Sequence, residues 1–303
     1  MSGVAELSIF DSKEPLPSKR LTDQGATLLG FEKRFQKVSR QLRLLMHLGD
    51  LQKWSQKHHG GPTRICNFVA AQYPLVIFYG DVGTGKTVTA ESIANRLVVE
   101  DDKADDSILF KLSTRVRGGG KVGEMGTLIN QAFQEVVKSA GGKRRAILII
   151  DEGDSLAAKR SQEHSHHEDK VAVNTLIQNI DELARFNGRI IIFLCTNRHS
   201  ALDPAILRRA AVKEEFLRPD EEERFDLFNL DLGEFGFSKK EISELVEATG
   251  LNKKRNASWT YSDIRLRLYP AALALAFPDK KLEMRHLLDS AREIEPSPVM
   301  EDV

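Results

Sequence analysis

The chain has 303 residues, and its 44 Lys and Arg side chains are balanced by 44 Asp and Glu side chains. This balance argues against nucleic-acid binding as a general function, although it says nothing about a local basic patch. Two cysteines, Cys66 and Cys195, are too few for a disulfide framework, and neither belongs to a CxxC pair. No signal peptide is evident, and the longest apolar runs, of about six to eight residues, are too short to span a bilayer. We therefore expect a cytoplasmic protein with no membrane contact.

Residues 1–30 are predicted to form a flexible N-terminal arm, because they are polar, contain Pro15 and Pro17, and show no helical or strand periodicity. From Phe31 onward, apolar residues recur at helical spacing, which predicts a helix. The opposite face of this helix, between Arg34 and Arg43, is basic. We interpret that face as solvent-exposed, with contact to a partner or to nucleic acid as the alternative.

From about residue 74, short β-branched and aromatic runs alternate with amphipathic stretches, which is typical of βαβ units and a parallel sheet. The predicted strands are Leu75–Tyr79, Ile108–Leu112, Ala146–Ile150, Ile190–Cys195 and Val212–Phe216, with helices at about 87–99, 121–139 and 170–185. Their continuous apolar character indicates strands buried on both faces. We predict an α/β domain over residues 31–233, with a five-stranded parallel sheet between helices. A small all-helical domain over 234–295 and a tail at 296–303 would follow.

One segment matches the phosphate-binding loop GxxxxGK[ST] in full, and it lies between a predicted strand and a predicted helix that continues with Val88. Glycines allow backbone N–H groups to converge on phosphates, and the helix N-terminus adds a favourable dipole. Lys86 would supply a cation to the β- and γ-phosphates, and the Thr87 hydroxyl would bind Mg²⁺. The alternative is a glycine-rich turn without a ligand. The matching residues are Gly80, Asp81, Val82, Gly83, Thr84, Gly85, Lys86 and Thr87.

Polar residues also follow two other predicted strands, at the edge where ligands bind in open α/β sheets. Asp151 is predicted to hold the Mg²⁺, and Glu152 to orient and deprotonate an attacking water. Adjacent acids alone often cap strands, but downstream of a complete phosphate loop this pair favours hydrolysis over transfer to a small-molecule acceptor. Asn197 is predicted to hydrogen-bond the γ-phosphate or the water, with a turn role as the alternative.

A short helix is predicted to begin at Pro204, with Asp203 as its N-cap. Two adjacent arginines, Arg208 and Arg209, end this segment. Either one could be a surface ion-pair partner. The more specific interpretation is an arginine finger, a guanidinium that reaches the nucleotide of a neighbouring subunit and stabilises charge in the transition state.

The phosphate loop, the Asp-Glu strand, the Asn-tipped strand and the Leu-Asp-Pro-Ala helix occur in the order found in AAA+ ATPases, and this resemblance covers about residues 70–275. Within that class the chain resembles the pachytene-checkpoint remodellers, which act on HORMA-domain proteins. The segment from Lys111 to Glu124 resembles the pore loop of that family and the helix after it. The resemblance implies ATP as the nucleotide, a homo-hexameric ring and a helical lid after the sheet domain.

The resemblance also implies roles for individual residues. It favours Arg209 over Arg208 as the finger, because members of this family keep one arginine at that position. It implies a nucleotide contact from the lid by Arg265, with Arg267 as the alternative. In the pore loop, Val116 stands between Arg115 and Arg117 where an aromatic residue is usual.

The region before the phosphate loop leaves little room for the substrate-binding domain of the eukaryotic members. This points to the bacterial branch, which is linked to antiphage systems built around cyclic-oligonucleotide signalling, with a bacterial HORMA protein as the client. The alternatives are a DNA-acting AAA+ motor or clamp loader that uses the basic helix at Arg34–Arg43, and a nucleotide-switched scaffold. We expect no direct contact with nucleic acid. The histidines at 164, 166 and 167 are interpreted as part of a polar loop and not as a metal site.

Overall fold

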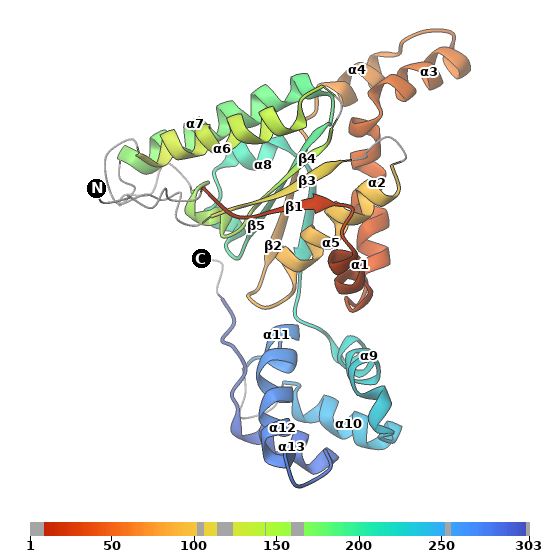
Figure 1. The fold of residues 1–303 in the computed structure, drawn as a ribbon, viewed down its shortest axis with the longest axis vertical. Coiled ribbons are helices and arrows are strands. Elements are labelled where there is room, and N and C mark those ends of the chain that lie inside the picture. The colour runs from red at the N-terminus through yellow and green to blue at the C-terminus, as the bar shows by residue number, and fades with distance from the viewer. Residues whose placement is uncertain are drawn as a thin grey trace.

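The computed structural model describes residues 9–101, 106–113, 124–142, 144–158, 167–251 and 256–300. Figure 1 shows a sheet with helices packed on it in the upper part of the molecule and a separate group of helices below. The chain passes from one to the other after the last strand of the sheet. This order agrees with the predicted α/β domain followed by a helical domain.

The sheet has six strands in the order β1-β3-β4-β5-β2-β6. All neighbours are parallel except β1 and β3, which pair antiparallel. The five predicted parallel strands are confirmed, each to within two residues, but the sheet has a sixth, antiparallel strand, β1, that was not predicted. Their bounds are β2 (Leu75–Gly80), β3 (Ser107–Leu112), β4 (Ala146–Ile150), β5 (Ile190–Thr196) and β6 (Ala210–Phe216).

The predicted flexible arm is wrong for residues 10–26, which form the edge strand β1 (Phe10–Leu16) and the helix α1 (Lys19–Ala26). The ring of Phe10 lies 4.9 Å from that of Phe110 on β3. The side chain of Asn95, on α5 (Lys86–Val99), accepts from the Ser18 backbone N–H at 2.6 Å and donates to the Thr22 hydroxyl at 2.9 Å. These partners are distant in sequence, so local periodicity does not reveal the strand.

Helices cover both faces of the sheet (Figure 1). Side chains from α6 (Glu124–Ala140) and α7 (His167–Leu183) form one core with the sheet, and side chains from α1, α2 (Phe31–Met46) and α5 form the other. Alternate residues of β4 enter the two cores, which explains its uninterrupted apolar run. The helices α3 (Leu48–His59) and α4 (Arg64–Ala70) project beyond the sheet, and α8 (Pro204–Arg209) precedes β6.

The lower group of helices, called the lid below, encloses a third core around the fully buried Trp259. Leu227 and Phe228 belong to this core, so the lid begins with α9, about a dozen residues before the predicted boundary at 233. A π-helical turn, η6 (Ile264–Leu268), lies between two of its helices. The helices are α9 (Glu221–Leu232), α10 (Lys239–Ala248), α11 (Tyr261–Asp263), α12 (Tyr269–Ala276) and α13 (Met284–Glu293).

Both cysteines lie in the interior as free thiols, with Cys66 on α4 only 6% exposed and Cys195 on β5 fully enclosed. Burial raises the pKa of the Cys195 thiol, and the charge of Asp151 acts in the same direction. In the described part of the chain, no helix combines the length and the apolar character needed to cross a membrane.

Candidate functional site

The phosphate loop joins β2 to α5 and takes a backbone path that requires glycine. Gly80 has a φ of 129°, and a Cβ there would lie 2.1 Å from the Phe216 carbonyl oxygen on β6. Gly83 and Gly85 also have positive φ values, 73° and 90°. The loop ends at the N-terminus of α5, a 14-residue helix whose dipole favours an anion at that end.

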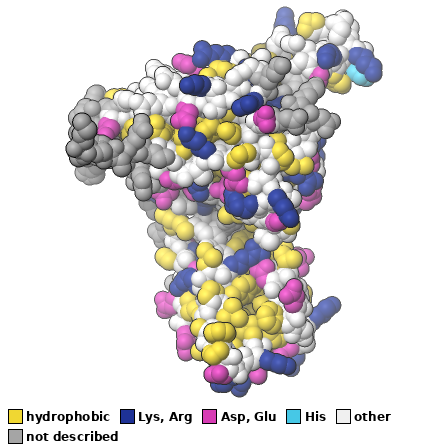
Figure 2. All heavy atoms as spheres, in the orientation of Figure 1, with side chains coloured by type: hydrophobic (Ala, Val, Ile, Leu, Met, Phe, Trp, Pro, Cys, Tyr) yellow, Lys and Arg dark blue, Asp and Glu magenta, His cyan; other side chains and the backbone are white. Residues whose placement is uncertain are grey.

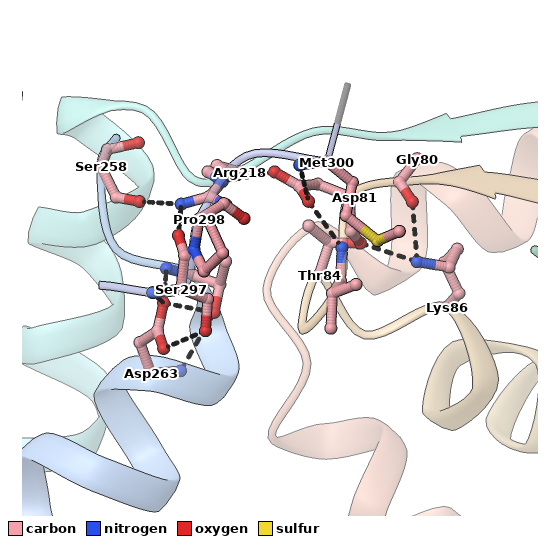
Figure 3. A network of polar contacts seen from close by, with 12 residues as sticks. Gly80, Asp81, Thr84, Lys86, Arg218, Ser258, Asp263, Ser297, Pro298 and Met300 are labelled. Carbon is pink, nitrogen blue, oxygen red and sulfur yellow. Dashed lines mark hydrogen bonds and ion pairs between the residues drawn. The ribbon is translucent and has the colours of Figure 1, made fainter. Parts of the chain in front are cut away.

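Lys86, the first residue of α5, is only 7% exposed. Its ammonium donates to the backbone carbonyls of Gly80 at 3.0 Å and Asp81 at 2.7 Å (Figure 3). Burial lowers the pKa of Lys86, and the nearby carboxylates of Asp151 and Asp81 act in the opposite direction. A cation is thus held beneath the loop, where a phosphate group would need it.

The two residues predicted to hold Mg²⁺ lie together, because the Thr87 hydroxyl donates to Asp151 Oδ2 at 2.9 Å. Oxygen ligands of this kind are the ones Mg²⁺ prefers, so the donor set fits that ion. Lys111 on β3 was not predicted to be a site residue, but its ammonium lies 4.0 Å from Asp151 Oδ2 and 3.5 Å from Glu91 Oε1. A lysine near the carboxyl end of a buried strand was the signal that could have identified it.

Glu152 has a φ of 50°, a left-handed conformation that is costly for any residue other than glycine. Its backbone N–H donates to Asp151 Oδ1 at 3.0 Å, and the residue as a whole is exposed. Strained positions of this kind concentrate at functional sites. On the next strand, the Thr196 hydroxyl donates to Asp154 Oδ1 at 2.8 Å, which fixes the strand end beside Asn197.

A cavity of about 350 Å³ opens at this edge of the sheet. Part of its lining comes from the predicted flexible N-terminal arm, which contributes Thr27 and Leu28. The lid contributes Tyr261, Ser262, Arg265 and Leu266. The cavity lies in the size range of small-ligand sites and collects most of the predicted binding residues. From the sheet domain it is lined by Gly83, Gly85, Lys86, Thr87, Val88, Asp151 and Asn197.

Of the two candidate lid arginines, Arg265 lines the cavity and Arg267 is not among the lining residues. The Arg265 guanidinium donates to both carboxylate oxygens of Asp231, at 2.7 and 2.8 Å, and to the Thr27 carbonyl at 2.8 Å. Arg267 instead pairs with Asp263 at 2.9 Å. Both arginines lie in the π-helical turn just before Pro270, which has no N–H to donate to a regular helix.

The two candidate finger arginines end α8, whose predicted N-cap is confirmed because the Asp203 carboxylate accepts from the Ala205 N–H at 2.8 Å. Arg209 donates to both oxygens of Asp181, at 2.5 and 2.8 Å. Arg208 is exposed. Neither arginine lines the cavity of its own chain. The pore-loop residues Arg115, Val116 and Arg117 and the histidines at 164 and 166 lie outside the described residues.

Arg218 is a further site residue that the sequence analysis missed. It lies two residues after β6, and its side chain donates to Asp81 Oδ2 at 2.5 Å. Its sequence signal is weak, a cation two residues after a strand that ends at this edge. The partner is 137 residues away, so no motif contains both.

A model of the ATPase family associated with various cellular activities (AAA) matches residues 76–218. CD-NTase-associated protein 6 of Escherichia coli strain KTE188 is 57% identical over 99% of this chain and 100% of its own length. A chain of the solved E. coli MS115-1 HORMA:CdnC:Trip13 complex has a TM-score of 0.88 at 33% identity, covering 96% of this chain and 97% of that one. Trip13 of Rhizobiales has a TM-score of 0.70 at 27% identity, covering 95% and 99%. The chain therefore belongs to the AAA ATPases, in the Trip13-like group that includes CD-NTase-associated protein 6.

Proposed function

We propose that this ATPase works as a homo-hexameric ring that remodels a bacterial HORMA-domain protein and thereby regulates cyclic-oligonucleotide antiphage signalling in the cytoplasm. The main observation in support of a nucleotide site is that Lys86, Thr87 and Asp151 line one cavity at the carboxyl edge of the sheet. The proposal of a HORMA client is supported by the Trip13-like chain that is solved together with HORMA and CdnC.

Four residues that line the cavity, together with Glu152, which follows Asp151 and is not among the lining residues, would share the steps of hydrolysis. Bound Mg²⁺-ATP would supply an electrophilic γ-phosphorus and a leaving group. Lys86 would balance the phosphate charge, and the oxygens of Thr87 and Asp151 would hold the ion. Glu152 would accept a proton from the attacking water, and Asn197 would orient that water. The exposed position of Glu152 suits a base that must meet solvent water.

Assembly into a ring is supported by two surface features. Arg208 and Arg209 do not line the cavity of their own chain. An arginine finger at either position would therefore have to act on the nucleotide of a neighbouring subunit. Apolar side chains also gather over the lid on the face drawn in Figure 2. Exposed lid residues that do not line the cavity include Leu275 at 49% and Phe277 at 79%, and apolar surface of this kind marks protein contacts.

The DNA-motor alternative depends on the basic face of α2, and several side chains of this face form ion pairs within the chain. Arg34 lies 3.9 Å from Glu214 and stacks over the ring of Phe216, and Lys37 pairs with the same glutamate. Arg43 pairs with Glu100. Arg34, Lys37 and Arg43 are thus paired within the chain, whereas the exposed Lys33 and Arg40 form no ion pair with the described residues. Stimulation of ATP turnover by DNA, with a steep salt dependence, would favour the alternative.

The substitution Glu152→Gln tests the hydrolytic role. We expect ATP to bind as before and steady-state turnover to fall by about 10²- to 10⁴-fold, since that is what a positioned general base contributes. Glu182→Gln is the matched control, because Glu182 is exposed and pairs only weakly with Arg185 at 3.4 Å. A Glu152→Gln enzyme that turns over ATP like the control would refute the assignment.

The same variant tests the client. In the presence of ATP, Glu152→Gln should retain a bacterial HORMA protein on size exclusion, because slow hydrolysis prolongs the bound state. Lys86→Ala, which removes the phosphate-binding cation, should not retain it. Equal retention by both variants would mean that the client binds without reference to the nucleotide, contrary to the proposal.

A further inference from the structure

The Arg218 side chain, only 9% exposed, connects three parts of the chain that are far apart in sequence. Its Nε donates to the carboxylate of Asp81 in the phosphate loop at 2.5 Å. One terminal nitrogen donates to the Ser258 carbonyl, between α10 and α11 of the lid, at 2.6 Å and to the Ser297 carbonyl at 2.8 Å. The other donates to the Pro298 carbonyl at 2.8 Å (Figure 3).

The segment Ser297–Met300, called the strap below, is held at both ends. At its first residue, the Ser297 backbone N–H and hydroxyl donate to the two carboxylate oxygens of Asp263 at 3.1 and 2.7 Å. At its last residue, the Met300 N–H donates to Asp81 Oδ1 at 3.3 Å. Asp263 belongs to the lid and Asp81 to the phosphate loop, so the strap spans the junction between them, as Figure 3 shows.

The lid also touches the phosphate loop directly beside the strap. The Ser262 N–H donates to the Gly83 carbonyl at 3.1 Å. A Cβ at Gly83 would lie 2.7 Å from the Thr260 hydroxyl and 2.8 Å from Ser262 Cβ, so the two surfaces are in close contact. The strap and Arg218 therefore reinforce a junction on which the shape of the cavity depends.

Asp81 links this junction to the cation of the site. Its backbone carbonyl accepts from the Lys86 ammonium and from the Thr84 hydroxyl, each at 2.7 Å, while its carboxylate accepts from Arg218 and the strap. A shift of Asp81 would therefore move both the loop backbone and the position of Lys86.

We propose that Arg218 is a positioning residue for the nucleotide site, and that together with the strap it holds the lid against the phosphate loop in the geometry that encloses the nucleotide. This inference rests on the proposed nucleotide site at Lys86. Because the cavity is lined from both sides, a nucleotide binds less tightly when the lid spends part of its time away from the loop. The planar guanidinium suits this role, since it can hold one carboxylate and three carbonyls at fixed angles.

The test is to measure the Kd of a fluorescent ATP analogue, together with kcat and KM, on two variants of the full chain. One is Arg218→Gln, and the other is a chain shortened to end at Pro296. We expect each to weaken nucleotide binding by about five- to tenfold. KM should rise more than kcat falls, because Asp151 and Glu152 are unchanged. Arg285→Gln is the control, since Arg285 is an exposed lid arginine that, among the described residues, forms an ion pair with Glu283 alone.

Combining the two changes tests whether Arg218 and the strap act as one unit. The double variant should bind the analogue about as well as either single variant, because each change breaks the same junction. If the fold-increase in Kd of the double variant equals the product of the two single increases, Arg218 and the strap act independently and the proposal is overturned. Ser297→Ala is the milder second variant if the shortened chain does not fold, and it should raise the Kd in the same direction. Hydrogen exchange at the Ser262 amide should quicken in every strap variant.

Lys86→Ala separates this inference from the proposed function. If that variant binds the analogue like the unaltered chain, the nucleotide site itself is wrong. If it loses binding while Arg218→Gln and the shortened chain bind with unchanged Kd, the nucleotide site stands and the role of the strap is refuted.

Discussion

Gly80 ends β2 at the start of the phosphate loop and lies directly opposite Phe216 of β6. The space for a Cβ is taken by the Phe216 carbonyl, and the φ of 129° is unfavourable for any other residue. This glycine is therefore required by the packing of β2 against β6 as well as by ligand binding.

We expect Gly80→Ala to destabilise the fold by more than about 2 kcal/mol, because it combines a backbone clash with a strained φ. Thermal unfolding of the purified chain would show this as a lower midpoint. Gly49→Ala is the control, since a Cβ at Gly49 meets nothing within 4 Å and alanine favours the helix there. Equal midpoints for the two variants would contradict the argument.

Asp263 gives stability a dependence on pH. Burial raises its pKa, but hydrogen bonds from Ser297, Thr260 and Arg267 outweigh this and hold the pKa below the ordinary value of 3.8. A carboxyl with a lowered pKa in the folded chain adds stability above its unfolded pKa, and that stability is lost as the pH falls through the folded pKa.

Asp263→Asn should therefore lower the midpoint of thermal unfolding at pH 7, and the difference from the unaltered chain should shrink once the pH is below 3.8. Scanning calorimetry at a series of pH values would measure it. Asp289→Asn, at a surface pair with 51% exposure, should leave the midpoint nearly unchanged at every pH. If the difference in midpoint between Asp263→Asn and the unaltered chain grew toward acid pH, the pKa of Asp263 would not be lowered by folding.

At the scale of elements, β1 carries more of the fold than its sequence indicates. It pairs with β3 over its whole length and buries Phe10 and Leu16 at its two ends. Pro15 is tolerated because an edge strand has one side without a partner strand. Without β1, the hydrogen-bonding edge of β3 would be open to other chains.

Removing residues 1–17 should therefore lower the thermal midpoint and promote aggregation, since burial of each large apolar side chain contributes about 1.5–3 kcal/mol. Light scattering during a thermal ramp measures both effects. A chain that begins at Ile9 keeps the whole strand and serves as the control. If the two shortened chains behave alike, β1 is dispensable.

The elements that were predicted correctly are those whose signal is local. The buried strands β2 to β6 are recognisable from their own apolar runs, and the phosphate loop from eight consecutive residues. Residues that depend on distant partners were missed. The contacts of β1, Arg218 and the strap join segments separated by many tens of residues, and neither periodicity nor a motif records such a pairing.

At the scale of the whole molecule, the separation of Arg208 and Arg209 from the cavity gives a test of assembly. If the finger acts on a neighbour, a variant without it and a variant without Lys86 can each supply what the other lacks. The pairing of Arg209 with Asp181 means that this arginine must leave an ion pair to act, whereas the exposed Arg208 need not.

Arg208→Ala and Arg209→Ala should each be mixed with Lys86→Ala, and ATP turnover should be measured for every mixture. The finger variant should lose about 10³-fold or more of its turnover alone and regain part of it in the mixture. The other arginine variant serves as the internal control, since it should retain turnover alone. If neither mixture regained ATP turnover, the result would argue against a nucleotide site shared between subunits.

The enclosed thiols of Cys66 and Cys195 have a practical consequence. A folded chain whose two native sulfhydryls are shielded from solvent should react slowly with maleimides, so it can serve as an unmodified background for dye attachment. One cysteine introduced on exposed α3 and another on the outer surface of α10 would place a donor and an acceptor fluorophore on the two halves of the molecule. Energy transfer between them would then report, in a single molecule, how far the halves separate during each turnover.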